Sequence, residues 1–158
     1  MVADHYYHYE NLHRDMLPRR PAWKGTSIVS RAQLSNSTTV FLVGNIGPTM
    51  EWYKQLGFDS RYFPPGFAIL RRDKVEIFLQ QQPDYVAPDE PGRQDREAWD
   101  VYIVTDNVKS LYDEYSTLPG VAISRALCPQ DYGMIEFDVM DLNGHRLVFA
   151  EPIPAKRS

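Results

Sequence analysis

The sequence predicts an α+β fold of two tandem βαβββ modules, which form curved mixed sheets with helices on the outer face. The same order of elements, one strand, one helix and three strands, can be read twice along the chain. The two halves also align in sequence, residues 38–45 with 99–106 and residues 75–79 with 145–149. A polar, proline-containing segment, residues 82–97, separates them. A repeat of a whole supersecondary unit indicates a duplicated fold.

The first module starts with a strand at residues 38–43, because a run of β-branched and aromatic side chains favours a buried strand. A helix is predicted after it. Asn45 can accept a hydrogen bond from the first helical turn, and Gly57 permits the left-handed backbone that ends many helices. The apolar stripe of this helix consists of Met50, Tyr53 and Leu56. Three short strands complete the module, at residues 59–63, 67–71 and 75–80.

The second module repeats this order. A strand is predicted at residues 99–105 and a helix at residues 107–118, which Gly120 and the preceding proline stop. The dipeptide Asn143-Gly144 is a strong signal for a tight hairpin between the last two strands. The apolar stripe of the helix consists of Val108, Leu111 and Tyr115. The three closing strands are predicted at residues 121–127, 134–140 and 146–151.

The composition favours a globular protein without a nucleic-acid partner. The chain has 158 residues and a formal net charge of −4, whereas proteins that bind phosphate backbones normally show a basic face. The single cysteine, Cys128, excludes a disulfide within the chain and favours a reducing compartment. There is no signal-peptide layout at the start and no apolar run of membrane-spanning length. We expect a soluble, cytoplasmic protein with no membrane partner.

The chain divides into three parts at the sequence level. Residues 1–36 form an N-terminal extension, residues 37–152 form the domain, and residues 153–158 form a tail. The domain consists of the two modules, at residues 37–81 and 98–151. The extension is polar and shows neither the period of a strand nor that of a helix, so we expect it to wrap the domain or a partner subunit.

Two features outside the module pattern invite a chemical interpretation. His5, His8 and His13 lie in the extension, but a solvated or interface helix is favoured over a metal site, because the segment is terminal and has no cysteine. Cys128 has no histidine or basic residue beside it in the sequence, which favours an inert thiol over a nucleophile.

Two stretches of the chain match known patterns of spaced residues. Residues 43–45 (VGN) followed by residues 51–58 (EWYKQLGF) are similar to the pattern V-x-D … FY-x-x-LGF. Residues 131–134 (DYGM) followed by residues 141–145 (DLNGH) are similar to the pattern YG … D-P-D-G. In these motifs the chain resembles the glyoxalase / bleomycin resistance / extradiol dioxygenase superfamily, also called vicinal oxygen chelate, on its bleomycin-resistance branch. The resemblance covers residues 37–152 and implies the same two-module fold.

The resemblance also points to the places where related enzymes hold a divalent metal. Four side chains, usually His and Glu, supply the ligands there, one at the start of the first strand and one in the last strand of each module. In this chain the four positions correspond to Thr38, Phe78, Trp99 and Val148. Phe and Val carry no donor atom for a metal, and the indole nitrogen of Trp only donates hydrogen bonds. We therefore expect neither a metal site nor another cofactor.

The alternation of side chains along the strands supports this alignment. A shift of the alignment by one residue would put Asp100, instead of Trp99, at the metal position, and we expect the alternation to exclude it. A slip of one residue moves every side chain of a strand to the other face of the sheet. The residues predicted to pack under the helices are Ile77, Leu79, Ile135, Phe137, Val139, Leu147 and Phe149. The concave side then carries Glu76, Phe78, Gln80, Met134, Glu136, Asp138, Arg146 and Val148.

Aromatic surface with a few carboxylates suits a flat, cationic ligand. The loop of residues 64–67 and Tyr132 can add walls to such a pocket. Two structural interpretations stay open: Phe78 and Trp99 can simply fill a collapsed cavity, and Glu136 with Arg146 can form a cross-strand ion pair. The predicted ligand-binding residues are Thr38, Phe67, Glu76, Phe78, Trp99, Tyr132, Met134, Glu136, Asp138, Arg146 and Val148.

The leading functional hypothesis is a metal-independent binding protein that sequesters a small, cationic and aromatic molecule such as an antibiotic. Relatives on this branch bind bleomycin in grooves shared by two subunits, so the resemblance implies a homodimer; whether the modules pair within one chain or between two stays open. Two alternatives remain. One is an enzyme with Glu136, Glu76 or Asp138 as general base, and the other is a ligand-free scaffold or regulatory module.

Overall fold

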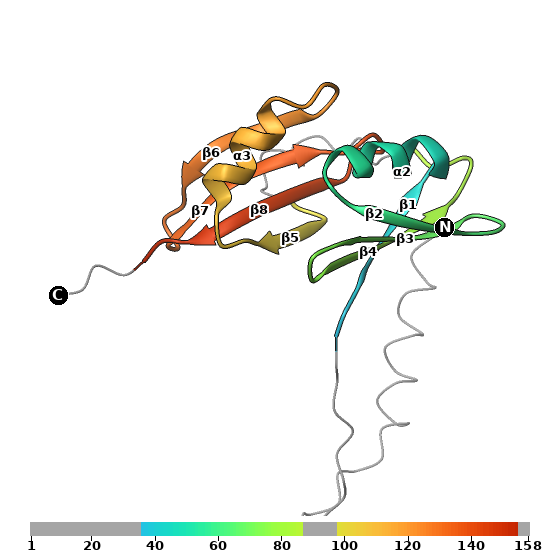
Figure 1. Ribbon diagram of the computed structural model, residues 1–158, viewed down its shortest axis with the longest axis horizontal. Helices are drawn as coiled ribbons and strands as arrows, with labels where there is room; N and C mark the ends of the chain where they lie inside the picture. Colours follow the sequence, from blue (N-terminus) through green and yellow to red (C-terminus); the bar gives the residue numbers. More distant parts are fainter. Residues whose placement is uncertain (1–35, 87–97, 155–158) are drawn as a thin grey trace, which may run out of the picture. The chain divides into compact units, whose positions relative to one another are not determined.

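The computed structural model describes residues 36–86 and 98–154, which contain two βαβββ modules (Figure 1). The predicted extension and most of the linker lie outside the described residues, together with the three N-terminal histidines. The predicted α+β fold of two tandem modules is confirmed. The first module consists of β1 (Thr39–Val43), α2 (Ile46–Gln55), β2 (Asp59–Phe63), β3 (Phe67–Arg72) and β4 (Val75–Gln81). The second consists of β5 (Val101–Val104), α3 (Val108–Ser116), β6 (Ala122–Pro129), β7 (Met134–Met140) and β8 (Arg146–Pro152).

Both sheets have the same mixed topology. The strand order is β1-β4-β3-β2 in the first sheet and β5-β8-β7-β6 in the second. The first strand of each module is an edge strand that pairs in parallel with the last strand of that module, and all other neighbours are antiparallel. Helix α2 packs on β2, β3 and β4, and α3 packs on β6, β7 and β8. Each helix therefore covers one face of its own sheet.

The predicted caps and turns set the ends of the elements. The side chain of Asn45 accepts a hydrogen bond from the backbone N–H of Gly47 at 3.3 Å, and Asn107 accepts one from the N–H of Ser110 at 3.0 Å. Gly57 ends α2 with a φ of +81°, a backbone conformation that favours glycine. Strand β5 begins only at Val101, two residues later than predicted.

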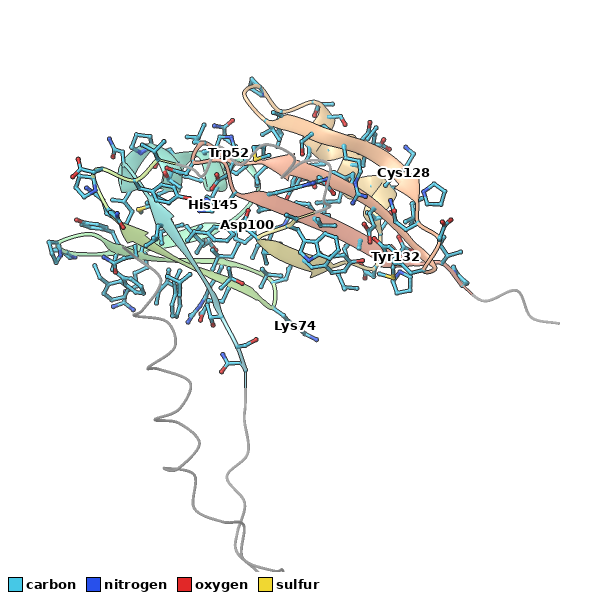
Figure 2. All side chains as sticks on the ribbon, turned by 180° about the vertical axis from the view of Figure 1, so that it is seen from behind. Trp52, Lys74, Asp100, Cys128, Tyr132 and His145 are labelled. Atoms are coloured by element: carbon cyan, nitrogen blue, oxygen red, sulfur yellow. The ribbon has the colours of Figure 1, made fainter. Side chains whose placement is uncertain are left out.

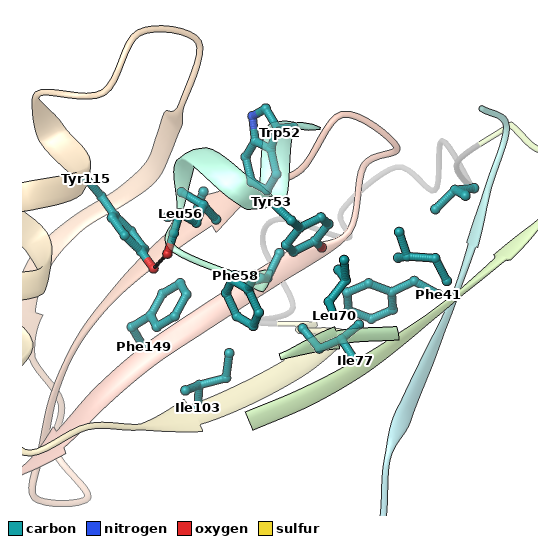
Figure 3. Close-up of a cluster of buried hydrophobic side chains, with 14 of the residues drawn as sticks. Phe41, Trp52, Tyr53, Leu56, Phe58, Leu70, Ile77, Ile103, Tyr115 and Phe149 are labelled. Carbon is teal, nitrogen blue, oxygen red and sulfur yellow. Dashed lines mark hydrogen bonds between the residues drawn. The ribbon is translucent and has the colours of Figure 1, made fainter. Parts of the chain in front are cut away.

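One hydrophobic core contains side chains of both modules (Figure 3). The stripe residues Tyr53, Leu56 and Tyr115 are fully buried, as predicted. Trp52, which the predicted stripe did not include, is 3% exposed, and its indole N–H donates to the carbonyl of Gly120 in the second module at 3.0 Å. The strand residues predicted to face the helices are confirmed as core residues or pack against the core: Ile77, Leu79, Ile135, Phe137, Val139, Leu147 and Phe149.

A buried carboxylate also joins the two modules. Oδ1 of Asp141 accepts hydrogen bonds from the backbone N–H groups of Asn143 (2.7 Å) and His145 (2.8 Å), which fixes the predicted hairpin turn. Oδ2 accepts from the hydroxyl of Tyr53 in the first module (3.1 Å) and lies 2.9 Å from Nδ1 of His145. The His145 ring stacks on Phe41 of β1, with ring centroids 4.2 Å apart. Burial raises the pKa of Tyr53, and Asp141 adds to the rise, so this phenol stays a donor.

Buried tyrosines make the stability of the fold sensitive to alkaline pH. Burial raises the pKa of Tyr115 to about 12, whereas tyrosine in an unfolded chain has a pKa of about 10. The folded state therefore holds this proton more tightly. The resulting stabilisation is complete below about pH 10 and is lost as the pH rises towards about 12. We expect the free energy of unfolding in urea to fall over that interval, and to fall less in Tyr115→Phe; equal slopes for the two proteins would contradict the assignment.

Candidate functional site

The face of the first sheet opposite α2 is called the first open face, and it is mainly apolar. Phe67 and Phe78 meet edge to face with centroids 5.2 Å apart, and Phe63 lies 5.9 Å from Phe67. The guanidinium of Arg61 lies 4.9 Å from the centroid of the Phe63 ring, a geometry that cation–π attraction favours. The face consists of Val40, Leu42, Asp59, Arg61, Phe63, Phe67, Ile69, Arg71, Glu76, Phe78 and Gln80.

A charged row borders this aromatic group. Glu76 contacts Arg71 at 2.5 Å and accepts a long hydrogen bond, 3.5 Å, from the hydroxyl of Thr38. A cavity of about 230 Å³ lies beside the row and is lined by Asp59, Ser60, Arg61, Ile69 and Arg71. Four predicted site residues, Thr38, Phe67, Glu76 and Phe78, are thus brought together at the first open face. The prediction missed Val40 and Ile69, although alternation from Phe78 across the paired strands could have found them.

The face of the second sheet opposite α3 is called the second open face, and it is polar. Its centre is a group of two carboxylates and two guanidinium groups, supplied by Glu136, Asp138, Arg125 and Arg146. Both carboxylate side chains are fully buried. The face consists of Tyr102, Val104, Arg125, Cys128, Met134, Glu136, Asp138, Met140, Arg146, Val148 and Ala150.

Every carboxylate of this group already has several donors. Glu136 accepts from the hydroxyl of Tyr102, from the hydroxyl of Tyr132 (2.9 Å) and from Nη2 of Arg125 (2.7 Å). Asp138 accepts from the same Nη2 (2.8 Å) and from Nε of Arg146 (2.6 Å). The lone pairs of Glu136 are therefore occupied, which disfavours the hypothesis that it acts as a general base.

The contacts within this group keep Arg125 charged and Tyr102 neutral. Burial alone would lower the pKa of Arg125, but its hydrogen bonds and charge interactions with Asp138 and Glu136 outweigh burial and raise it. Burial raises the pKa of Tyr102, and its hydrogen bond to Glu136 adds to the rise. Arg125 is thus a stable cation and Tyr102 a neutral donor. The two positive and two negative side chains balance in charge.

The prediction that Glu136 and Arg146 form a cross-strand ion pair is wrong. Arg146 lies opposite Met140 in the β7–β8 ladder, and its guanidinium contacts Asp138. Arg125 of β6 is the cation that contacts Glu136. The prediction missed Arg125 because the register of β6 against β7 shifts on both sides of this residue, and a bulge breaks the strict alternation on which the prediction depended.

The predicted alignment of the two first strands is wrong by one residue. Thr39 and Val101 begin the parallel pairings of β1 and β5 with equivalent partners in β4 and β8. The equivalent of Thr38 is therefore Asp100 rather than Trp99; Asp100 is labelled in Figure 2. Trp99 precedes β5, is 42% exposed, and its ring centroid lies 5.7 Å from that of Tyr102. Alternation did not apply to Trp99 because the strand starts after it.

This correction places one carboxylate among the positions at which related enzymes hold a metal. Asp100 uses Oδ2 to accept from the backbone N–H of Arg146 at 2.8 Å. The other three positions hold Thr38, Phe78 and Val148, of which Val148 is fully buried. Within residues 36–86 and 98–154, no group of three or more His, Cys, Asp and Glu side chains could hold a metal ion. The donor set at these positions does not suit a divalent metal.

The remaining predicted residues lie at the rim of the second open face. Tyr132, in the turn between β6 and β7 (Figure 2), is 55% exposed and reaches back to Glu136. Met134 is half-buried at the start of β7. Cys128 is also half-buried, lies opposite Glu136, and accepts a contact from Nε2 of Gln130 at 3.2 Å. A separate cavity of about 490 Å³ lies beside Arg72 and Tyr115; among its described lining residues Val104 is the one from the second open face, and it contains none of the predicted residues.

Comparison with known proteins gives a clear answer for the fold. No family model matches the sequence, and no curated protein matches it. Among solved structures, a bleomycin resistance determinant encoded on transposon Tn5 has a TM-score of 0.58 at 16% identity, over 75% of this chain and 98% of that one. A bleomycin-binding protein complexed with bleomycin has a TM-score of 0.56 at 16% identity, over 77% and 100% of the two chains. The chain has the glyoxalase/bleomycin-resistance fold.

A third structure with the glyoxalase/bleomycin-resistance fold confirms the assignment. The glyoxalase/bleomycin resistance protein/dioxygenase from Alicyclobacillus acidocaldarius has a TM-score of 0.63 at 12% identity, over 76% of this chain and 92% of that one. Such low identities establish the fold, and the chemistry must be read from the side chains of the open faces. Among the helices that the structure describes, none combines the length and apolar character needed to cross a membrane.

Proposed function

We propose that this protein binds a small, flat and largely aromatic molecule on its open faces, without a metal ion, and so sequesters it. The observation that carries the proposal is the group of accessible aromatic side chains on sheet faces that the helices do not cover. Phe78 and Phe67 supply the group on the first sheet, and Trp99 and Tyr102 supply it at the second. Pockets for such ligands are typically aromatic with a few placed polar groups.

The bleomycin-binding protein supports the proposal, because it has the same fold and was crystallised with bleomycin. An antibiotic is therefore a reasonable member of the ligand class for this chain. A cytoplasmic location and a role in resistance belong to the same proposal.

A homodimer is part of this proposal. Strands β1 and β5 are edges of their sheets, and they expose apolar side chains: Val40 is 55%, Leu42 39% and Val104 60% exposed. Exposed apolar edge strands are normally covered. A second copy that covers them would place ligand sites in grooves shared by the two subunits. Sedimentation at micromolar concentration should show a dimer, and a monomer would contradict this part of the proposal.

The ligand site is tested by thermal shift with a panel of aromatic compounds that includes bleomycin, with and without a chelator. A ligand that binds the folded state raises Tm, and the rise grows with the logarithm of its concentration divided by Kd. We expect at least one compound to do so equally in both buffers. We expect Phe78→Ala to weaken its binding by about tenfold or more, equivalent to about 1.4 kcal/mol, because the substitution removes one of the two rings that meet edge to face.

Tyr62→Ala is the matched control. Tyr62 is an exposed aromatic side chain of β2, at 44%, but it lies between Arg61 and Phe63 and so faces away from the first open face. Its removal should leave the affinity unchanged. Equal effects of the two substitutions, or Tm shifts that vanish with chelator, would contradict the proposed site or its metal independence.

A further inference from the structure

We infer that the ligand is an uncharged aromatic compound whose carbonyl oxygen accepts a hydrogen bond from Arg125. This inference depends on the proposed function and specifies the ligand class of the same site. It replaces the expectation of a cationic ligand, which was based on aromatic surface together with the carboxylates of Glu76, Glu136 and Asp138. The structure shows that those carboxylates are already paired.

A bound cation would find no carboxylate to neutralise it on the second open face. Glu136 accepts from Tyr102, Tyr132 and Arg125, and Asp138 accepts from Arg125 and Arg146. An ammonium group would have to displace one of these donors. Breaking a buried charge pair strongly destabilises a protein, so a cationic ligand binds here only at that cost.

A bound anion meets the opposite difficulty. The two guanidinium groups are balanced by Glu136 and Asp138, both with fully buried side chains. A third carboxylate would add an uncompensated negative charge beside two others. Burying a net charge without a partner is unfavourable. The charge balance of the cluster therefore selects a neutral ligand.

One hydrogen-bond donor in this group of two carboxylates and two guanidinium groups, Nε of Arg125, has no acceptor among the residues that the structure describes. Both bonds from Arg125 to the carboxylates use the same nitrogen, Nη2. Its Nε is buried and has no hydrogen-bond partner within the described part of the chain. Buried donors are almost always satisfied in folded proteins. Nε itself has no exposed surface, although 19% of the side chain is exposed, so a neutral carbonyl oxygen accepts from Nε after the guanidinium turns towards the open face.

Aromatic side chains close to the cluster suit the remainder of such a ligand. Tyr132 is 55% exposed at its edge, and the rings of Trp99 and Tyr102 lie 5.7 Å apart at an angle of 54°. A flat ring can stack against these faces while its carbonyl points to Arg125. Naphthalene carboxamide, naphthoate and naphthylmethylammonium form a matched set of neutral, anionic and cationic probes.

The test is a calorimetric comparison of these three probes with the full-length protein. We expect the carboxamide to bind at least about tenfold more tightly than either ion, about 1.4 kcal/mol. Tighter binding of naphthylmethylammonium or naphthoate would overturn the inference and leave the proposed aromatic site standing. If none of the three probes binds, and no compound of the wider aromatic panel binds either, both the inference and the proposed function fail.

Arg125→Lys tests the contact itself. Lysine keeps the positive charge beside Glu136 and Asp138 but has no Nε–H and no planar fork, so the preference for the carboxamide should disappear. Lys109→Arg is the control, because Lys109 is 66% exposed on α3, away from both open faces, and pairs with Asp113; it should keep the preference. NMR of the wild-type protein gives an independent readout. The Nε–H signal of Arg125 should shift when the carboxamide is added, and an unchanged signal would refute the contact.

Discussion

Asp138→Ala is expected to lower the free energy of unfolding by about 3–5 kcal/mol, because it breaks a buried charge pair and removes a carboxylate that two guanidinium groups contact. The carboxylate of Asp138 is fully buried and contacts both Arg146 and Arg125. Arg125 keeps Glu136 after the substitution, but the side chain of Arg146 is only 10% exposed and cannot easily reach water. Urea unfolding followed by circular dichroism measures the change.

Glu76→Ala is the control for that prediction. It also removes a carboxylate from an open face, that of the first sheet, but Arg71, the partner of Glu76, is 68% exposed. An exposed ion pair contributes about 1 kcal/mol or less, so this variant should unfold close to the wild type. If Asp138→Ala cost no more than Glu76→Ala, the cluster would not be the buried, charge-balanced group described above.

Asp141→Ala is expected to cost about 3 kcal/mol or more, because several buried donors lose their acceptor at once. The carboxylate accepts from two backbone N–H groups of the β7–β8 turn, from the hydroxyl of Tyr53, and lies beside His145. Tyr53 belongs to the first module, so the substitution also weakens the junction between the modules.

The milder variant Asp141→Asn separates these two effects. An asparagine oxygen can still accept from the backbone of the turn, whereas its NH₂ group cannot accept from Tyr53. Asp141→Asn should therefore lose less stability than Asp141→Ala. If Tyr53→Phe in the Asp141→Asn background caused as large a further loss as it does in the wild type, the hydrogen bond between the two residues would not contribute.

Alternation along the strands was enough to predict the core and much of the open faces. Apolar residues at every second position placed Ile77, Leu79 and Leu147 under the helices, and the same parity placed Glu136 and Asp138 on the opposite face. These predictions hold because β4, β7 and β8 pair without interruption over the residues concerned. The period of two is a property of the backbone itself.

The errors arose where that period does not apply. Trp99 was aligned with Thr38 by sequence, but β5 starts at Val101, and the shift by one residue moves Asp100 into that position. Arg125 was missed because the ladder between β6 and β7 is irregular around it. Neither a late strand start nor a bulge has a clear signal in a single sequence, since both depend on the pairing with neighbouring strands.

We propose that the open faces bind a small aromatic molecule without a metal. The most direct measurement is NMR mapping of the chelator-treated protein during titration with the tightest compound of the aromatic panel. We expect chemical-shift changes centred on Phe78, Trp99, Tyr102 and Arg125. Changes confined to the cavity beside Arg72 and Tyr115, or changes that appear only after a divalent metal is added, would contradict it.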